Sequence, residues 1–295
     1  MSAIELERME HVSAGDVRLA YAEAGAGTPL VLIHGSLSDA RSWEHQLPAL
    51  AERHRVIAYS RRYSPPNEPV EPGATDPMPP HVDDLLALLR ELGAAPAHLV
   101  GDSWGGFIAL LAALREPGLV RSLALGEPPA LSLFVSTPPR PSELLSLALR
   151  RPRTAAAIVR LGAGVMAPAQ KRFDRGDDEG AMLTVAHGLL GREVFESLPE
   201  ARRAQARENL PTLRAQLPAG FPPLDEGAIQ RLQIPTLLLE GTAGPVVFRR
   251  LIDRLEELLP VSERVTIEGA SHGMHEQRPD EFNRALLEFL ARAGA

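Results

Sequence analysis

Short apolar runs alternate with helix-like patterns over the first 129 residues of the chain. Nearly continuous apolar runs, which are typical of strands buried on both faces of a sheet, occur at residues 30–33, 55–59, 99–100 and 120–125. Residues 17–22 alternate apolar and polar side chains and predict a strand that precedes them. We therefore expect five strands in this part of the chain.

Helical periodicity appears between these runs. Residues 81–92 predict an amphipathic helix, because Val82 and three leucines recur on one face. Residues 104–115 are mostly apolar, which is typical of a buried helix, and a short helix is expected near 42–52. Residues 60–80 are rich in proline and polar side chains and are expected to be a loop.

The alternation stops after residue 129. Residues 130–231 have an almost wholly helical pattern, with breaks expected at 138–141, 162–168, 188–191 and 218–223. A helical segment that interrupts a strand–helix alternation is typical of a cap or lid. The pattern therefore predicts a helical cap between two parts of a core.

The strand–helix alternation resumes in the last 64 residues. Strands are expected at residues 236–239 and 265–267, with a helix between them and a final helix that carries Phe282 and Phe289. The whole pattern predicts an α/β fold, in which helices cover both faces of a mostly parallel sheet. We expect its first part at 1–129, the cap at 130–231 and its second part at 232–295.

Composition narrows the classes of protein that fit this pattern. The chain has 295 residues, 44% of them hydrophobic, and a net charge of −7, which disfavours nucleic acid as a partner. It has no cysteine, so disulfides, thiol nucleophiles and cysteine metal sites are excluded. Residues 1–10 are polar, and no apolar run approaches the ~18 residues that a membrane span needs. We expect a cytoplasmic protein without a membrane span; the sequence does not indicate its oligomeric state.

The stretch of chain around Ser103 carries the most informative motif. Gly101 and Gly105 flank this serine two residues away on either side, directly after a predicted strand and directly before a predicted helix. This context is that of a nucleophile elbow, a sharp turn that lifts the serine hydroxyl above the sheet. Since active sites of open parallel sheets lie at the carboxyl ends of strands, Ser103 predicts a catalytic site there.

Other polar side chains share that position. His34, Glu127 and His272 each fall just past the end of a predicted strand, as Ser103 does. Strand ends of a parallel sheet meet at one edge, so we expect these side chains to converge on one site.

With these motifs the chain resembles the α/β-hydrolase fold family over nearly its whole length. The matching segments are residues 34–36 (His-Gly-Ser), 101–106 (Gly-Asp-Ser-Trp-Gly-Gly) and 269–272 (Gly-Ala-Ser-His), in the family order serine, acid, histidine. The fold hosts esterases, lipases, lactonases, amidases, epoxide hydrolases, dehalogenases and carbon–carbon hydrolases. Epoxide hydrolases and haloalkane dehalogenases of this fold carry Asp at the elbow, so Ser103 favours acyl transfer.

The resemblance assigns the base to His272, with His275 as a competing position three residues later. The acid departs from the common pattern. Many relatives place an Asp in the loop after the strand that follows the cap, but this chain has Gly244 there. Some branches place the acid one strand earlier, where this chain has Glu127. We therefore expect Glu127 to orient His272, with Glu240 as the alternative.

An oxyanion hole requires two backbone N–H groups. One is expected from Trp104, the residue after the nucleophile, and the other from Ser36 or, as an alternative, Leu37. The Ser36 hydroxyl is a candidate further donor. His34 is expected to brace this loop, and the Trp104 indole either lines the acyl pocket or packs in the core.

Several polar residues have no assigned chemistry. Arg61 and Arg62 follow a predicted strand and either contact substrate or brace a loop. Asp102 is expected to point away from the cleft. The arginines of the cap, among them Arg202 and Arg214, are expected to form a solvated helix face.

The sequence thus predicts a serine hydrolase that cleaves a small-molecule carboxylic ester through an acyl-enzyme, using Ser103, His272 and Glu127 and no cofactor or metal. The alternatives are a lactonase, an amidase or a carbon–carbon bond hydrolase with the same residues, or a non-catalytic ligand-binding protein. An intact Ser103 and His272 favour an enzyme. Nothing in the pattern indicates which acyl or alcohol group is preferred.

Overall fold

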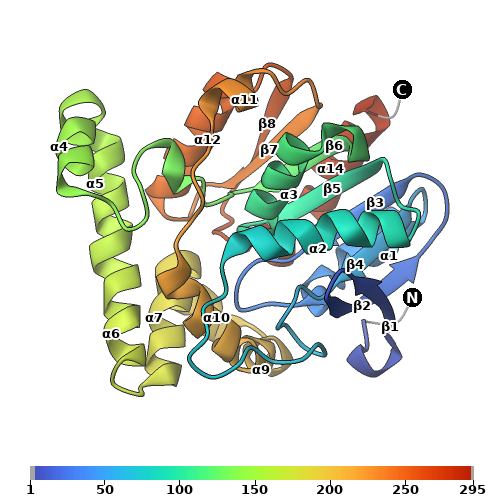
Figure 1. The fold of residues 1–295 in the computed structure, drawn as a ribbon, viewed down its shortest axis with the longest axis horizontal. Helices are drawn as coiled ribbons and strands as arrows, with labels where there is room; N and C mark the ends of the chain where they lie inside the picture. Colours follow the sequence, from blue (N-terminus) through green and yellow to red (C-terminus); the bar gives the residue numbers. More distant parts are fainter. Residues whose placement is uncertain (1–3, 294–295) are drawn as a thin grey trace.

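Eight strands form one sheet at the centre of the computed structural model, which describes residues 4–293 (Figure 1). Their order across the sheet is β1-β2-β4-β3-β5-β6-β7-β8. The pairs β1·β2 and β2·β4 are antiparallel, and all other neighbours are parallel. The strands are β1 (Glu10–Ala14), β2 (Val17–Ala24), β3 (Pro29–Ile33), β4 (Arg55–Tyr59), β5 (Ala97–Asp102), β6 (Val120–Gly126), β7 (Thr236–Gly241) and β8 (Ser262–Ile267). The predicted mostly parallel sheet is confirmed.

The first strand of the sheet is the one that the sequence pattern misses. Three of the five residues of β1 are exposed, and its only partner in the sheet is β2. A strand at an edge buries little, so its sequence lacks the apolar run that marks β3 or β4. Of the polar segment 1–10, residues 1–3 lie outside the described residues.

Helices cover both faces of the sheet (Figure 1). One face packs against α2, α3 and α12 through residues such as Leu85, Phe107 and Leu255, and the other against α1 and α14 through Leu50 and Phe289. These helices, with the short α13, are α1 (Gln46–Ala51), α2 (Met78–Glu91), α3 (Trp104–Arg115), α12 (Val246–Leu258), α13 (Met274–Gln277) and α14 (Pro279–Ala293), and short 3-10 turns lie at η1 (Leu6–Arg8), η2 (Ala40–Trp43) and η3 (Pro117–Leu119).

Two helix boundaries differ from the sequence prediction. The helix α2 begins at Met78, inside the expected loop, because Pro79 and Pro80 occupy its first turn, where their missing N–H groups cost nothing. The single helix expected at 42–52 is instead the 3-10 turn η2 followed by α1.

The chain between β6 and β7 contains helices and no strand among its described residues. We call residues 130–231 the helical insertion. Its elements are η4 (Leu131–Leu133), α4 (Pro141–Arg150), α5 (Pro152–Leu161), the π-helical turn η5 (Gly162–Met166), α6 (Ala167–Phe173), α7 (Asp178–Leu190), α8 (Arg192–Ser197), α9 (Glu200–Glu208), α10 (Leu210–Gln216), η6 (Leu217–Ala219) and α11 (Glu226–Gln230). The break expected at 162–168 is wrong, because η5 joins α5 to α6 without interruption.

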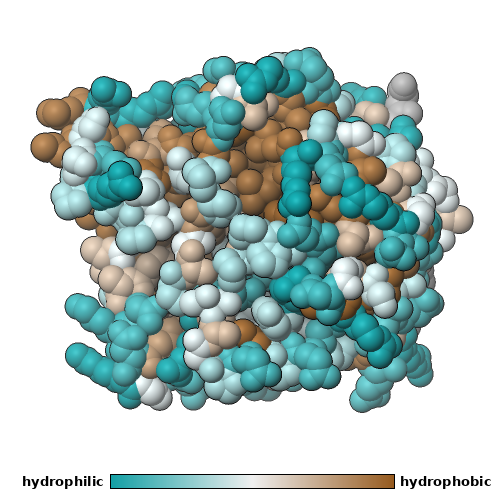
Figure 2. All heavy atoms as spheres, viewed as in Figure 1, coloured by the Kyte–Doolittle hydropathy of each residue, from teal (hydrophilic) through white to brown (hydrophobic). Residues whose placement is uncertain are grey.

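The insertion has its own apolar cluster, which includes Phe173, Met182 and Phe195 and extends to Leu37 of the loop after β3. Its outer corner, at α4, shows hydrophobic spheres in Figure 2, where Leu145 and Leu149 are 65% and 79% exposed. Within residues 4–293, no helix combines the length and apolar character that crossing a membrane requires. The insertion packs on the core at two places: on the loop after β3 through Leu37, and on α12 through a second apolar cluster that includes Ile158 and Leu251.

Candidate active site

The elbow at Ser103 has the geometry that its glycines predict. Ser103 has φ 50° and ψ −118°, between the end of β5 and the start of α3. A Cβ on Gly105 would lie 2.0 Å from the Ile33 carbonyl oxygen, and one on Gly101 would lie 2.4 Å from the Gly105 backbone. Only glycine fits at either place, and the Ser103 N–H donates to the Gly126 carbonyl at 2.7 Å. The turn is thus held tightly against the neighbouring strands β3 and β6.

His272 and Glu127 meet at this edge of the sheet. His272 lies in the loop after β8, and its Nδ1 is 2.6 Å from Glu127 Oε2. The other carboxylate oxygen of Glu127 accepts from the Gly241 N–H at 2.9 Å, which fixes its direction. Both side chains are buried, and the His272 ring stacks on Phe248 with centroids 4.0 Å apart. The imidazole is therefore held from its Nδ1 side and along its face.

The opposite nitrogen of this ring is free. Among residues 4–293, His272 Nε2 is buried and has no hydrogen-bond partner. A base that accepts the nucleophile's proton uses this nitrogen when the acid holds Nδ1. His272 and Ser103 line the same cavity.

The pKa of His272 reflects two opposing causes. Burial disfavours the imidazolium, but the hydrogen bond and charge of Glu127, with a smaller contribution from Asp102, outweigh it. The pKa of His272 is therefore raised above its ordinary value, so the ring is a stronger base than a buried histidine alone.

The two alternative acid positions differ sharply in their surroundings. Glu240 accepts hydrogen bonds from Arg264 Nη2 at 2.7 Å and from the Thr266 hydroxyl at 3.1 Å. Its carboxylate therefore binds side chains of β8 and not His272. Gly244, in the loop after β7, lies beside the Glu127 carboxylate: a Cβ there would be 3.7 Å from both of its oxygens. The loops after β6 and β7 therefore reach the same point, and Glu127 occupies it.

The cavity above these residues has a volume of about 70 Å³. Ser103, His272 and Ser36 line one side, and the insertion contributes apolar side chains, namely Val185, Ala186, Leu189, Leu190 and Phe195. The site is thus an apolar pocket with convergent polar groups, the usual form of a small-molecule site.

Backbone strain gathers around this cavity. Among the described residues, four that are not glycine have a positive φ, and three of them are Leu37, Ser103 and Glu127. Such conformations cost free energy and cluster at functional sites, because the surrounding contacts must hold them.

The two expected oxyanion donors have free backbone N–H groups. No hydrogen bond within the described part of the chain uses the N–H of Ser36 or of Trp104. The Ser36 hydroxyl, expected as a further donor, instead donates to Gln216 Oε1 of α10 at 2.7 Å. The Trp104 indole packs in the core, with ring centroids 5.5 Å from His81 and 6.3 Å from Phe221.

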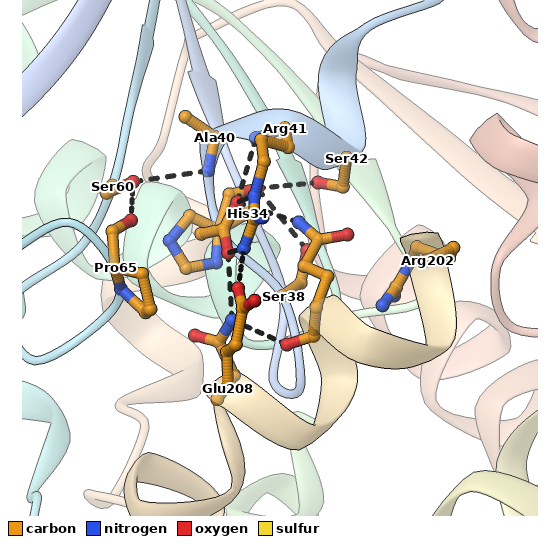
Figure 3. Close-up of polar contacts among 12 residues, drawn as sticks. His34, Ser38, Ala40, Arg41, Ser42, Ser60, Pro65, Arg202 and Glu208 are labelled. Atoms are coloured by element: carbon orange, nitrogen blue, oxygen red, sulfur yellow. Dashed lines mark hydrogen bonds and ion pairs between the residues drawn. The ribbon is translucent and has the colours of Figure 1, made fainter. Parts of the chain in front are cut away.

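Polar contacts tie the loop after β3 to the insertion (Figure 3). Asp39 is fully buried, and its carboxylate accepts from Gln205 Nε2 at 2.7 Å and Asn209 Nδ2 at 2.9 Å. Arg41 also holds Asp39 and reaches Glu208 of α9, as Figure 3 shows. Because this loop contains Ser36 and Leu37, the insertion holds the same segment that carries the expected donor.

Two polar expectations about the site are wrong. Arg202 is not on a solvated face: it pairs with Glu276 at 2.9 Å and donates to the Leu37 carbonyl at 3.0 Å. Asp102 lines the cavity instead of pointing away from it, and its Oδ1 lies 3.8 Å from His275 Nδ1. Burial raises the pKa of Asp102.

The competing base, His275, is not the partner of the acid. Its ring packs against Trp43 with the ring centroids 4.5 Å apart, whereas the hydrogen bond of Glu127 goes to His272.

Comparisons with known proteins identify the family of this chain. A family profile described as the α/β hydrolase fold matches residues 28–279. The chain belongs to the α/β-hydrolase family. The matched residues run from the turn before β3 to the first residue of α14.

Relatives within the family have different activities. Epoxide hydrolase A of Mycobacterium tuberculosis is 30% identical, over 95% of this chain and 96% of that protein. A 2-hydroxy-6-oxo-6-(2'-aminophenyl)hexa-2,4-dienoic acid hydrolase of Metapseudomonas resinovorans is 26% identical, over 95% and 90%. A thermophilic esterase from Thermogutta terrifontis matches with a TM-score of 0.76 at 20% identity, covering 98% of this chain and 100% of that one. The last likeness shows the fold alone.

Proposed function

We propose that this α/β-hydrolase cleaves carboxylic esters through an acyl-enzyme formed on Ser103. The observation that carries the proposal is the contact of 2.6 Å between Glu127 Oε2 and His272 Nδ1, beside a serine at the elbow. A serine hydroxyl needs an adjacent base to become a nucleophile, and this pair supplies one with a raised pKa.

The reaction runs in two halves. Ser103 Oγ attacks the ester carbonyl carbon while His272 Nε2 takes its proton, and the oxyanion is held by the N–H groups of Trp104 and Ser36. The tetrahedral intermediate collapses, and His272 returns the proton to the leaving alcohol. Water, activated by the same histidine, then attacks the acyl-enzyme and releases the acid. Glu127 orients His272 and stabilises the imidazolium that forms in each half of the reaction.

The helical insertion acts as the cap of this site. Its side chains Leu189, Leu190 and Phe195 form the apolar wall that receives the acyl group. Since the cavity has a volume of about 70 Å³, we expect short acyl chains to be preferred.

Epoxide opening is the chemistry of the relative from Mycobacterium tuberculosis by its name. Ser103 favours acyl transfer over that reaction, because epoxide hydrolases of this fold use an Asp at the elbow. Cleavage of a lactone, an amide or a carbon–carbon bond would use the same residues.

A series of 4-nitrophenyl esters with graded acyl length tests the proposal. We expect turnover, greatest for short acyl chains and unchanged by a chelator, and a loss in kcat on the order of 10⁴-fold for Ser103→Ala. Circular dichroism and the Tm verify that the variant folds. A folded Ser103→Ala protein that keeps most of the activity contradicts the proposal.

A further inference from the structure

Arg61 is a buried cation without an ion pair. Its exposed fraction is 1%, and within residues 4–293 no carboxylate oxygen lies within 4 Å of its guanidinium, in contrast to Arg62 and its partner Asp84. Two of its donors reach backbone carbonyls: Nε donates to the His34 carbonyl at 3.0 Å, and Nη2 to the Gly35 carbonyl at 2.9 Å. The third, Nη1, lies 3.5 Å from His81 Nδ1. A buried charge is costly unless its surroundings use it.

His34 donates to the same carbonyl as Arg61. The Arg61 backbone N–H donates to His34 Nε2 at 2.9 Å, so that nitrogen is unprotonated and the proton lies on Nδ1. The Nδ1–H then donates to the Gly35 carbonyl at 2.9 Å. Burial and the Arg61 charge hold the pKa of His34 well below its ordinary value, which keeps this tautomer neutral. The Gly35 carbonyl therefore accepts two hydrogen bonds, one of them charged.

The two hydrogen bonds fix the direction of one peptide group. The Gly35 carbonyl and the Ser36 N–H belong to the same planar trans peptide, so they point in opposite directions. Donors that hold the carbonyl on the inner side turn the Ser36 N–H away from Arg61. That N–H has no other partner in the described chain, and Ser36 lines the cavity beside Ser103.

Arg61 also packs against the residue that supplies the second donor. Its guanidinium carbon is 5.2 Å from the centroid of the Trp104 ring, and the backbone N–H of Trp104 is the other proposed oxyanion donor. The guanidinium thus hydrogen-bonds to one donor peptide and contacts the side chain of the other donor residue. In a site without water, a fixed positive charge acts on an oxyanion more strongly than it would in solvent.

We infer that Arg61 is the positioning residue of the oxyanion hole: it holds the Gly35–Ser36 peptide in the donating orientation and supplies positive charge behind it. The inference rests on the proposed ester hydrolysis at Ser103. It assigns to Arg61 a role in the transition state, because the substrate carbonyl carries little charge before attack.

The test compares Arg61→Met with Arg62→Met, which removes the neighbouring buried arginine and its ion pair with Asp84. Two ligands report on the site: a short alkyl trifluoromethyl ketone, which adds to the serine as an anionic hemiketal, and the matching methyl ketone, which stays neutral. For Arg61→Met we expect kcat to fall roughly 10- to 100-fold with KM nearly unchanged. Its Ki for the fluorinated ketone should rise by a similar factor, while the Ki for the methyl ketone stays the same.

Arg62→Met should lower the Tm but leave kcat and both Ki values near wild type. If Arg61→Met does not fold, Arg61→Lys replaces it, because lysine keeps the charge but lacks the planar fork that reaches two carbonyls. We then expect about a tenfold loss in kcat and in affinity for the fluorinated ketone.

A folded Arg61→Met, or otherwise Arg61→Lys, with wild-type kcat and wild-type affinity for the fluorinated ketone overturns the inference. So does an equal loss of affinity for both ketones, which would show a structural role only. A wild-type protein that neither hydrolyses esters nor binds the fluorinated ketone contradicts the proposed function itself, and the role of Arg61 falls with it.

Discussion

The carboxyl edge of the sheet and the helical insertion border the same cavity but contribute different side chains to it. The edge supplies Ser103, Glu127 and His272, held by short hydrogen bonds and strained backbone. The insertion supplies an apolar wall, and its polar residues, such as Asn209 and Arg202, hold the loop after β3. We therefore propose that the edge determines the rate of the chemistry, whereas the insertion determines which substrate fits.

After the loss expected for the nucleophile itself, the largest effect should come from the acid at the edge. We expect Glu127→Gln to lower kcat by roughly 10² to 10⁴, because the acid orients His272 and stabilises its charge without reacting itself. Glu240→Gln is the matched control: its carboxylate binds Arg264, so kcat should stay within about threefold of wild type. Steady-state kinetics on one ester measure both. Equal losses for the two variants would contradict the assignment of the acid to Glu127.

A second substitution sharpens this result. A Cβ atom added to Gly244 would meet no atom closer than 3.4 Å and would lie 3.7 Å from both Glu127 carboxylate oxygens. We expect Gly244→Asp to recover about tenfold in kcat when added to Glu127→Gln, since it supplies a carboxylate from the adjacent loop. In the wild-type background it should instead reduce kcat, because two carboxylates would then compete at one histidine. No recovery in a folded double variant would mean that the loop after β7 cannot reach Nδ1.

The pH dependence of kcat/KM reports on the same edge. Activity requires neutral His272, so kcat/KM should rise with pH through the pKa of the free enzyme. Because that pKa is raised, we expect the midpoint above about 6.5, the ordinary value for histidine. In Glu127→Gln only burial remains as the main cause, and the midpoint should move to lower pH. A midpoint that moves upward, or a flat profile, would contradict His272 as the base.

The smallest expected effect lies in the insertion. Phe195→Ala enlarges the apolar wall and should change the ratio of kcat/KM between octanoate and acetate esters by roughly tenfold, in favour of the longer chain. Its activity on the acetate ester should change little. Leu149→Ala serves as the control, since this residue of α4 is 79% exposed and does not line the cavity. If Phe195→Ala instead lowered kcat for every ester equally, the insertion would share in the chemistry.

The sequence predicts the sheet best where local pattern and burial agree. The strand β4 matches its predicted bounds because four of its five residues are buried, and α3 matches because it begins directly after the elbow serine. The edge strand β1 has no such pattern. The π-helical turn at Gly162–Met166 joins two helices although its glycines predict a break.

Some features of the site could likewise be predicted from the sequence, and others could not. Ser103, His272 and Glu127 follow strand ends, so the topology alone brings them to one edge. The partner of the Ser36 hydroxyl, Gln216, lies 180 residues along the chain, and no local pattern encodes that contact. The contacts of Arg61 with the carbonyls of His34 and Gly35 join residues 27 and 26 positions apart and are also not encoded by a local pattern. Such contacts depend on how separate loops pack together, which periodicity does not describe.

The most direct test of the account is where a fluorophosphonate attaches. This reagent phosphonylates an activated serine, and intact-mass and peptide analysis locate the adduct. We predict one adduct per chain, on Ser103, formed more slowly in Glu127→Gln and absent in Ser103→Ala. An adduct on another residue, or none in a protein that hydrolyses esters, would contradict an acyl-enzyme on Ser103.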